Sequence, residues 1–99
     1  MEQPLPIGLT TEEDIAFDFT PWLAGASIAN YTLTPSANLT KLSDSKTGGK
    51  VVAWVKPGSG VKVGASMWMD CYVVTNDTPP RKDTRRYLLV ASVRTVIPQ

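Results

Sequence analysis

The sequence contains no histidine and only one cysteine, Cys71. Without histidine, the Ser-His-Asp and Cys-His catalytic arrangements are excluded, and the commonest general base and metal ligand is missing. A single thiol excludes an intrachain disulfide and a zinc site built from several cysteines. The glycines at 48–49 and 58–60 lack the lysine-serine ending of a phosphate-binding loop. We therefore expect no enzyme, no catalytic residues, no cofactor and no metal ion.

Long apolar runs are also missing. No segment reaches the ~18 consecutive apolar residues of a membrane helix, and the N-terminus lacks the positive and hydrophobic regions of a signal peptide. We expect the protein to be made and used without crossing a membrane by the ordinary secretory route, and to have no membrane partner. The length of 99 residues and a hydrophobic fraction of 42% predict one domain with a core of its own.

The last third of the chain carries the clearest strand pattern. Residues 66–75 and 85–97 alternate in period two and are rich in β-branched and aromatic side chains. The connection between them, residues 76–84, contains two prolines, which cannot continue a ladder. This predicts a long β-hairpin. Cys71 lies mid-strand among apolar neighbours, so we expect a buried thiol that acts as a small hydrophobic group.

The rest of the chain predicts further short strands and no convincing helix. Trp22 and Leu23 follow a proline and are expected to fold over the end of the core. Lys50 to Lys56 are apolar on both faces of the strand, which predicts a central strand buried on both sides. The other expected elements are a half-buried strand around Ile15, Phe17 and Phe19, a strand over residues 27–34, and a short edge strand with a turn at Gly48-Gly49 within residues 36–49.

These elements predict an all-β fold, a small antiparallel β-sandwich of about six to seven strands. Residues 1–11 contain Pro4, Pro6 and Gly8 and are interpreted as an extended N-terminal arm rather than a regular element. The predicted organisation is an arm over residues 1–11 and a sandwich domain over residues 12–99.

Charge is unevenly distributed although the net charge is only +1. The first five charged residues of the chain are all acidic, and the first basic residue is Lys41. The five are Glu2, Glu12, Glu13, Asp14 and Asp18. Either acidic and basic strands face each other within the fold, or the molecule has two unlike surfaces for head-to-tail assembly.

A basic cluster near the hairpin turn has three interpretations: a solvated loop, a protein contact or a nucleic-acid contact. The cluster consists of Arg81, Lys82, Arg85 and Arg86. Because Asp77 and Asp83 lie among these residues and the domain is near neutral, we do not expect nucleic acid as a partner. Asp70 shares a strand face with Trp68 and Tyr72, so it is expected on a wet outer face or paired with an arginine such as Arg94.

The segment DFTPWLAGASI (residues 18–28) resembles the aspartate–aromatic, leucine, glycine and isoleucine pattern that opens small tailed-phage virion proteins of the fibre–tail adaptor family. As in that family, an aromatic residue, Tyr31, follows in the next strand. Glycines 58, 60 and 64 precede a long strand, and Arg85 or Arg86 opens the last strand. The resemblance runs from about Glu13 to Arg94, although residues 76–84 form a longer turn than is usual in the family.

The resemblance implies an immunoglobulin-like sandwich that assembles into a ring or onto a capsid or tail surface, with no cofactor and no catalysis. We expect a structural protein of the virion, assembled in the host cytoplasm, that forms a homo-oligomer and contacts other phage structural proteins. The arm and the hairpin turn are the expected contacts. The residues expected to touch a partner are Leu5, Ile7, Asp77, Arg81, Lys82, Arg85 and Arg86.

Two alternatives stay open. A capsid decoration protein would have the same fold and similar partners. A carbohydrate-binding module would stack sugars on exposed aromatic side chains, for which Trp22, Trp54, Trp68 and Tyr72 are available. The apolar run around Trp54 favours burial of that side chain, which speaks against the carbohydrate-binding alternative.

Overall fold

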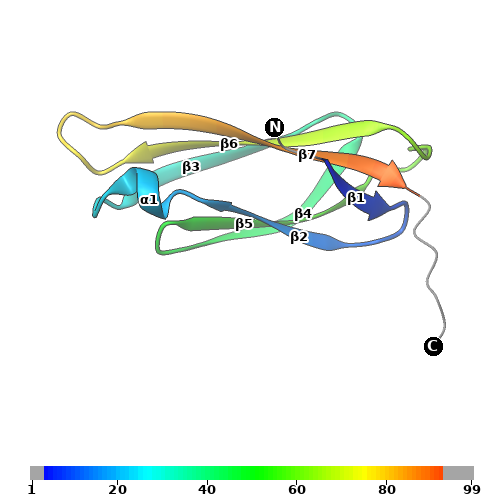
Figure 1. Ribbon diagram of the computed structural model, residues 1–99, viewed down its shortest axis with the longest axis horizontal. Coiled ribbons are helices and arrows are strands. Elements are labelled where there is room, and N and C mark those ends of the chain that lie inside the picture. Colours follow the sequence, from blue (N-terminus) through cyan, green and yellow to red (C-terminus); the bar gives the residue numbers. More distant parts are fainter. Residues whose placement is uncertain (1–3, 93–99) are drawn as a thin grey trace.

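The computed structural model describes residues 4–92, which form two facing β-sheets (Figure 1). The elements in chain order are β1 (Leu5–Gly8), β2 (Glu13–Asp18), α1 (Thr20–Leu23), β3 (Ile28–Pro35), β4 (Leu39–Thr47), β5 (Lys50–Pro57), β6 (Ser66–Thr75) and β7 (Lys82–Ser92). Sheet A has the order β1-β7-β6-β3, and sheet B has the order β2-β5-β4. The sheet of β2, β5 and β4 therefore faces the sheet that contains β7, β6 and β3. The same grouping of strands is found in immunoglobulin domains. The predicted all-β, immunoglobulin-like sandwich is confirmed.

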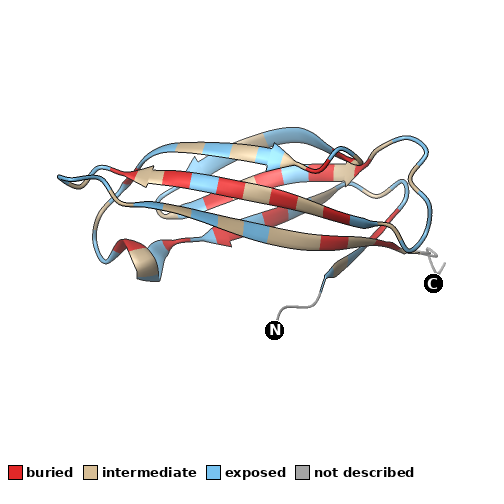
Figure 2. Ribbon diagram, turned by 90° about the horizontal axis from the view of Figure 1, so that it is seen from above, coloured by how far each residue is buried: buried red, intermediate tan, exposed pale blue. Residues whose placement is uncertain are grey.

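The core lies between the two sheets and is filled mainly by alternate residues of β2, β5, β6 and the end of β7 (Figure 2). Phe19, Met69 and Val73 have no exposed surface. Cys71 is fully buried among them, and this burial raises the pKa of its thiol to about 12. The thiol is therefore neutral at physiological pH, and the prediction that it acts as a small hydrophobic group is confirmed.

The central hairpin of β6 and β7 has the predicted first strand and a shifted second one. β6 spans Ser66–Thr75, as expected, whereas β7 begins three residues early, at Lys82. Asp70 therefore lies opposite Arg86. The expected partner Arg94 lies outside the described residues, as do residues 93–97 of the predicted strand.

The N-terminal segment is not free of regular structure, contrary to the prediction. Leu5–Gly8 form β1, which pairs with Leu89–Ser92 of β7 in parallel. Ile7 has no exposed surface, and Leu5 packs against the core. The sequence hides this strand because it is only four residues long, contains a proline and pairs with a segment more than eighty residues away.

β5 is the central strand of sheet B, as predicted, but only one of its faces is buried. Val51, Ala53 and Val55 point into the core, whereas Trp54 is 45% exposed. Among residues 4–92, no layer covers the outer face of sheet B. The expectation that Trp54 is buried is therefore wrong.

α1 is a single helical turn that the sequence analysis did not predict. It closes one end of the sandwich, with Leu23 buried and Trp22 packed against the core, as expected of these two anchors. The backbone N–H of Phe19 donates to the Gly49 carbonyl oxygen at 2.8 Å. A Cβ at Gly49 would lie 2.7 Å from Thr20 Oγ1, so this close approach requires glycine. The β4–β5 turn falls at Gly48-Gly49, as predicted, although β4 is longer than the expected short edge strand.

Within residues 4–92, the longest helix has four residues, so none is long and apolar enough to cross a membrane.

Candidate interaction surface

The turn between β6 and β7, residues 76–81, is fastened to α1 by Arg81. Arg81 Nη1 donates to the Trp22 carbonyl oxygen at 2.8 Å, and Nη2 donates to the Leu23 carbonyl oxygen at 2.7 Å. The guanidinium carbon lies 4.9 Å from the centre of the Trp22 ring. The last carbonyl groups of a helix lack partners within the helix. Arg81 satisfies two of them and so joins the turn to the end of the core.

Asp77 and Thr75 complete this network inside the turn. Arg81 Nε donates to Asp77 Oδ2 at 2.5 Å, and this bond holds the pKa of Asp77 below its ordinary value. Thr75 is 1% exposed, and its hydroxyl oxygen accepts from the Arg81 backbone N–H at 2.8 Å. Two of the predicted partner contacts, Asp77 and Arg81, therefore bind each other and the chain's own backbone.

Arg85 also turns inward. It lies opposite the buried Cys71, and its guanidinium carbon is 4.4 Å from the centre of the Phe19 ring. Nη1 donates to the Asp18 carbonyl oxygen at 3.1 Å, and Nε donates to Asp83 Oδ2 at 3.1 Å. The side chain thus covers the end of the core between the two sheets.

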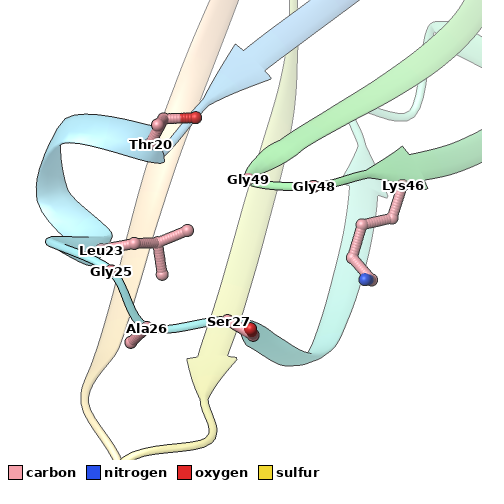
Figure 3. Close-up of a pocket in the computed structure, with 8 residues that line it drawn as sticks. All are labelled: Thr20, Leu23, Gly25, Ala26, Ser27, Lys46, Gly48 and Gly49. Atoms are coloured by element: carbon pink, nitrogen blue, oxygen red, sulfur yellow. The ribbon is translucent and has the colours of Figure 1, made fainter.

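Two hollows among residues 4–92 have no acidic or cysteine side chain in their lining. One, of about 240 Å³, lies between α1 and the β4–β5 turn, with Lys46 as its only charged lining residue (Figure 3). Another, of about 480 Å³, lies beside the β5–β6 connection, with Lys62 as its only charged lining residue. In the described part of the chain, no group of three or more acidic or cysteine side chains is placed to hold a metal ion.

A different group of side chains faces outward from sheet A. We call Trp68, Asp70, Tyr72, Arg86 and Leu88 the outer patch. They lie on β6 and β7 and point away from the core, because the residues that alternate with them are directed inward. Trp68 lies opposite Leu88, and Asp70 opposite Arg86. Tyr72 is 37% exposed, and Lys82 continues the same face towards the turn.

Arg86 is held in place at the centre of the outer patch. Its Nε and Nη2 donate to the two carboxylate oxygens of Asp70 at 2.7 Å and 3.0 Å. These bonds raise the pKa of Arg86, and its guanidinium carbon lies 4.0 Å from the centre of the Trp68 ring. The patch therefore presents an aromatic ring, a bidentate ion pair and a tyrosine in a fixed order on a sheet.

The structure separates the residues that the sequence marked as partner contacts. Arg86 and Lys82 lie on the outer face of sheet A, whereas Ile7, Arg81 and Arg85 bind within their own chain. Sequence reasoning did not count Trp68, Tyr72 and Leu88 among the contacts. The period-two alternation of β6 already placed Trp68, Asp70 and Tyr72 on one face, and this was the signal that could have found the patch.

Comparison with known families agrees with the resemblance seen in the sequence. The family described as podophage GP4 fiber-tail adaptor protein gp77 matches residues 10–90, most of the chain. No curated protein matches the sequence significantly. The matched segment spans α1, the strands β2 to β6 and most of β7, including the outer patch. The chain therefore belongs to the podophage GP4 fiber-tail adaptor family and is a structural protein of the phage tail.

Proposed function

We propose that this protein joins the tail fibre to the tail as a homo-oligomer, in which each copy uses its outer patch to contact another phage structural protein. The observation that carries the proposal is the arrangement of Trp68, Arg86 and Asp70, which are exposed or half-buried and already fixed in position. No catalysis is involved, because the protein works by binding.

The outer patch has the composition of a strong protein contact. Trp, Tyr and Arg are the residues most enriched among those that dominate binding energy at interfaces. Asp70 and Trp68 hold the guanidinium of Arg86 before any partner arrives. Less side-chain freedom is therefore lost on binding, which favours affinity.

Several copies in one assembly strengthen such a contact. Linked copies bind with a high effective concentration, so the avidity of the assembly exceeds the affinity of a single patch. A symmetric homo-oligomer presents one patch per copy to partners that are themselves repeated. We place this assembly in the virion, built in the host cytoplasm, with no nucleic acid or membrane among its direct partners.

The two alternatives differ in what they require of the protein. A carbohydrate-binding module needs a row of free ring faces. Here Trp54 lies on sheet B and Trp68 on sheet A, and Arg86 lies over the Trp68 ring. A capsid decoration protein would use the same patch, but in a number close to that of the capsid protein.

Copy number in purified virions tests the proposal directly. Quantitative mass spectrometry against the major capsid protein should find a small, fixed number of copies per particle. A number comparable to the capsid protein would replace the adaptor with a decoration protein. Absence from the particles would overturn the virion function altogether.

A pair of tryptophan variants then tests the outer patch. We expect Trp68→Ala to lower the amount of tail fibre on particles from a complemented deletion phage at least tenfold. Trp54→Ala is the matched control, because it removes an exposed tryptophan from the opposite sheet. Equal fibre content in the two variants would exclude the outer patch as the contact.

A further inference from the structure

Sheet B has two edges that no other described strand covers. Its order is β2-β5-β4, and each outer strand pairs only with β5 within residues 4–92. The outward backbone N–H and C=O groups of an edge strand can pair with a strand of another chain. The two edges lie on opposite sides of β5.

The two edges carry opposite charge. β2 and the residue before it contain Glu12, Glu13, Asp14 and Asp18 and no basic residue. β4 contains Lys41 and Lys46 and a single acid, Asp44. Asp44 is compensated within the strand by an ion pair with Lys41, which lowers its pKa. The β2 edge is therefore acidic and the β4 edge weakly basic.

The pairing of β2 and β4 with the central strand β5 shows which of their residues lie at the same level, that is, opposite the same residue of β5. Val55 of β5 lies opposite both Glu13 and Lys41, and Lys50 lies opposite both Asp18 and Thr47. Since β2 and β4 both run antiparallel to β5, they run parallel to each other. Every residue of β2 has a counterpart in β4 at its own level, and Leu42 is the one extra residue, at the bulge.

In a closed ring of identical copies, residues at the same level of the β2 and β4 edges lie side by side. In such a ring the copies are related by rotation about an axis parallel to the strands, with no translation along that axis. The β4 edge of one copy then meets the β2 edge of the next, and the two strands run in the same direction. Glu13 of one copy then lies beside Lys41 of its neighbour. The pairing covers all of β2, from Glu13 to Asp18.

Lysines and a bulge on β4 also protect an edge against indiscriminate pairing. Two β4 edges would bring their lysines together, and two β2 edges would bring together four acids on each side. Only the combination of β2 with β4 places opposite charges side by side. The same features that oppose self-pairing of an edge therefore select the head-to-tail arrangement.

We propose that copies of this chain associate head to tail through sheet B, with the β2 edge of one copy parallel to the β4 edge of the next and Glu13 level with Lys41. This inference rests on the homo-oligomer proposed above and names its interface. It adds a contact between copies to the contact that the outer patch makes with another protein.

Cysteine cross-linking tests the arrangement. In purified virions, a chain carrying both Glu13→Cys and Lys41→Cys should form a ladder of disulfide-linked multimers under mild oxidation, because facing residues of neighbouring strands lie within disulfide reach. Glu13→Cys alone and Lys41→Cys alone should give no disulfide-linked dimer. The native Cys71 is fully buried and does not contribute.

Charge reversal in solution gives an independent readout. By light scattering after gel filtration, we expect Glu13→Lys and Lys41→Glu each to weaken self-association about tenfold, and the double reversal to restore it. Lys62→Glu is the control, since it makes the same charge change in the β5–β6 connection. Melting curves of all variants show whether each is folded.

The outcomes distinguish this interface from the adaptor function. Virions that contain the double-cysteine chain but give no ladder would overturn the proposed interface and leave the adaptor function standing. Disulfide-linked dimers of either single-cysteine variant would also overturn it, because they indicate that like edges are in contact. Virions that lack even the wild-type chain would overturn the adaptor function itself.

Discussion

The two faces of β7 carry the same kinds of residue and use them differently. Arg85 points inward and binds the Asp18 carbonyl group and the Phe19 ring. Arg86, its neighbour, points outward and rests on Trp68 and Asp70. The sequence alone makes these arginines look equivalent. One face of the strand stabilises the fold, and the other is free for a partner.

A basic cluster therefore cannot be assigned to a partner from its composition alone. Arg81, next to the start of β7, behaves like Arg85, with three side-chain bonds inside its own chain. Changes on the inner side should therefore alter stability, and changes on the outer side should alter binding. We expect the effect on stability to decrease from Ile7 through Arg81 and Asp77 to Arg86.

Ile7→Ala should have the largest effect. Ile7 has no exposed surface and lies on β1 opposite Ala91 of β7. The cavity left by the substitution should lower the free energy of unfolding by about 2–5 kcal/mol, as measured by urea denaturation. Leu9→Ala is the control, because Leu9 follows β1 and is 39% exposed. A fragment beginning at residue 12 should lose at least as much stability.

If that fragment is instead as stable as the whole chain, residues 1–11 form a separable arm. The division of the chain at residue 11 stays a prediction until this measurement is made.

Arg81→Ala should have the next largest effect, a loss of about 2 kcal/mol, because two helix-end carbonyl groups and Asp77 lose a charged partner. Arg81→Lys should recover little of this, since lysine cannot reproduce the planar fork. Lys82→Ala is the matched control at the adjacent exposed position. If Arg81→Ala and Lys82→Ala lower the free energy of unfolding equally, the inner and outer sides of β7 do not differ in their contribution to stability.

Acid should have the next largest effect, because it weakens the ion pairs of Asp77 and Asp44. The pKa of Asp77 is lowered by Arg81, and that of Asp44 by Lys41, from an ordinary value of 3.8. A lowered pKa in the folded state contributes stability above the unfolded value, and this contribution is lost as the pH falls through the folded value. The free energy of unfolding should therefore fall below about pH 4. Asp77→Asn should make this fall shallower; an unchanged slope would show that Asp77 does not contribute.

Arg86→Ala should have the smallest effect on stability and the largest on binding. Exposed ion pairs contribute little to folding, so the melting temperature should match that of the wild type. Fibre content of the particles should fall as it does for Trp68→Ala. A lower melting temperature with normal fibre content would assign Arg86 to the fold and exchange the roles of the two faces.

Much of the fold follows from local patterns in the sequence. β6 could be predicted to the residue, since alternation with aromatic and β-branched residues extends over its whole length. β2 follows from the same alternation, and the anchors Trp22 and Leu23 from the proline that ends this strand. β1 was not, because four residues with a proline show no alternation and their pairing is non-local.

The candidate surface was harder to predict because alternation does not say which face is covered. Trp54 stands in an apolar run, yet one side of its strand is open. The sequence predicts Asp70 on a wet outer face or paired with an arginine such as Arg94, and the observed register of β6 and β7 brings Arg86 opposite instead. Register depends on where the turn closes, which in this chain depends on the bonds of Arg81 and Thr75.

The parallel pairing of β1 with β7 has a mechanical consequence. β1 is the first described strand and β7 the last, and they run side by side in the same direction. A pull on the segments before β1 and after β7 acts along the strands in opposite directions. The hydrogen bonds between β1 and β7 then resist in shear, all at once, rather than opening one after another. A protein built in this way withstands tension along its long axis, which suits a joint between a fibre and a tail.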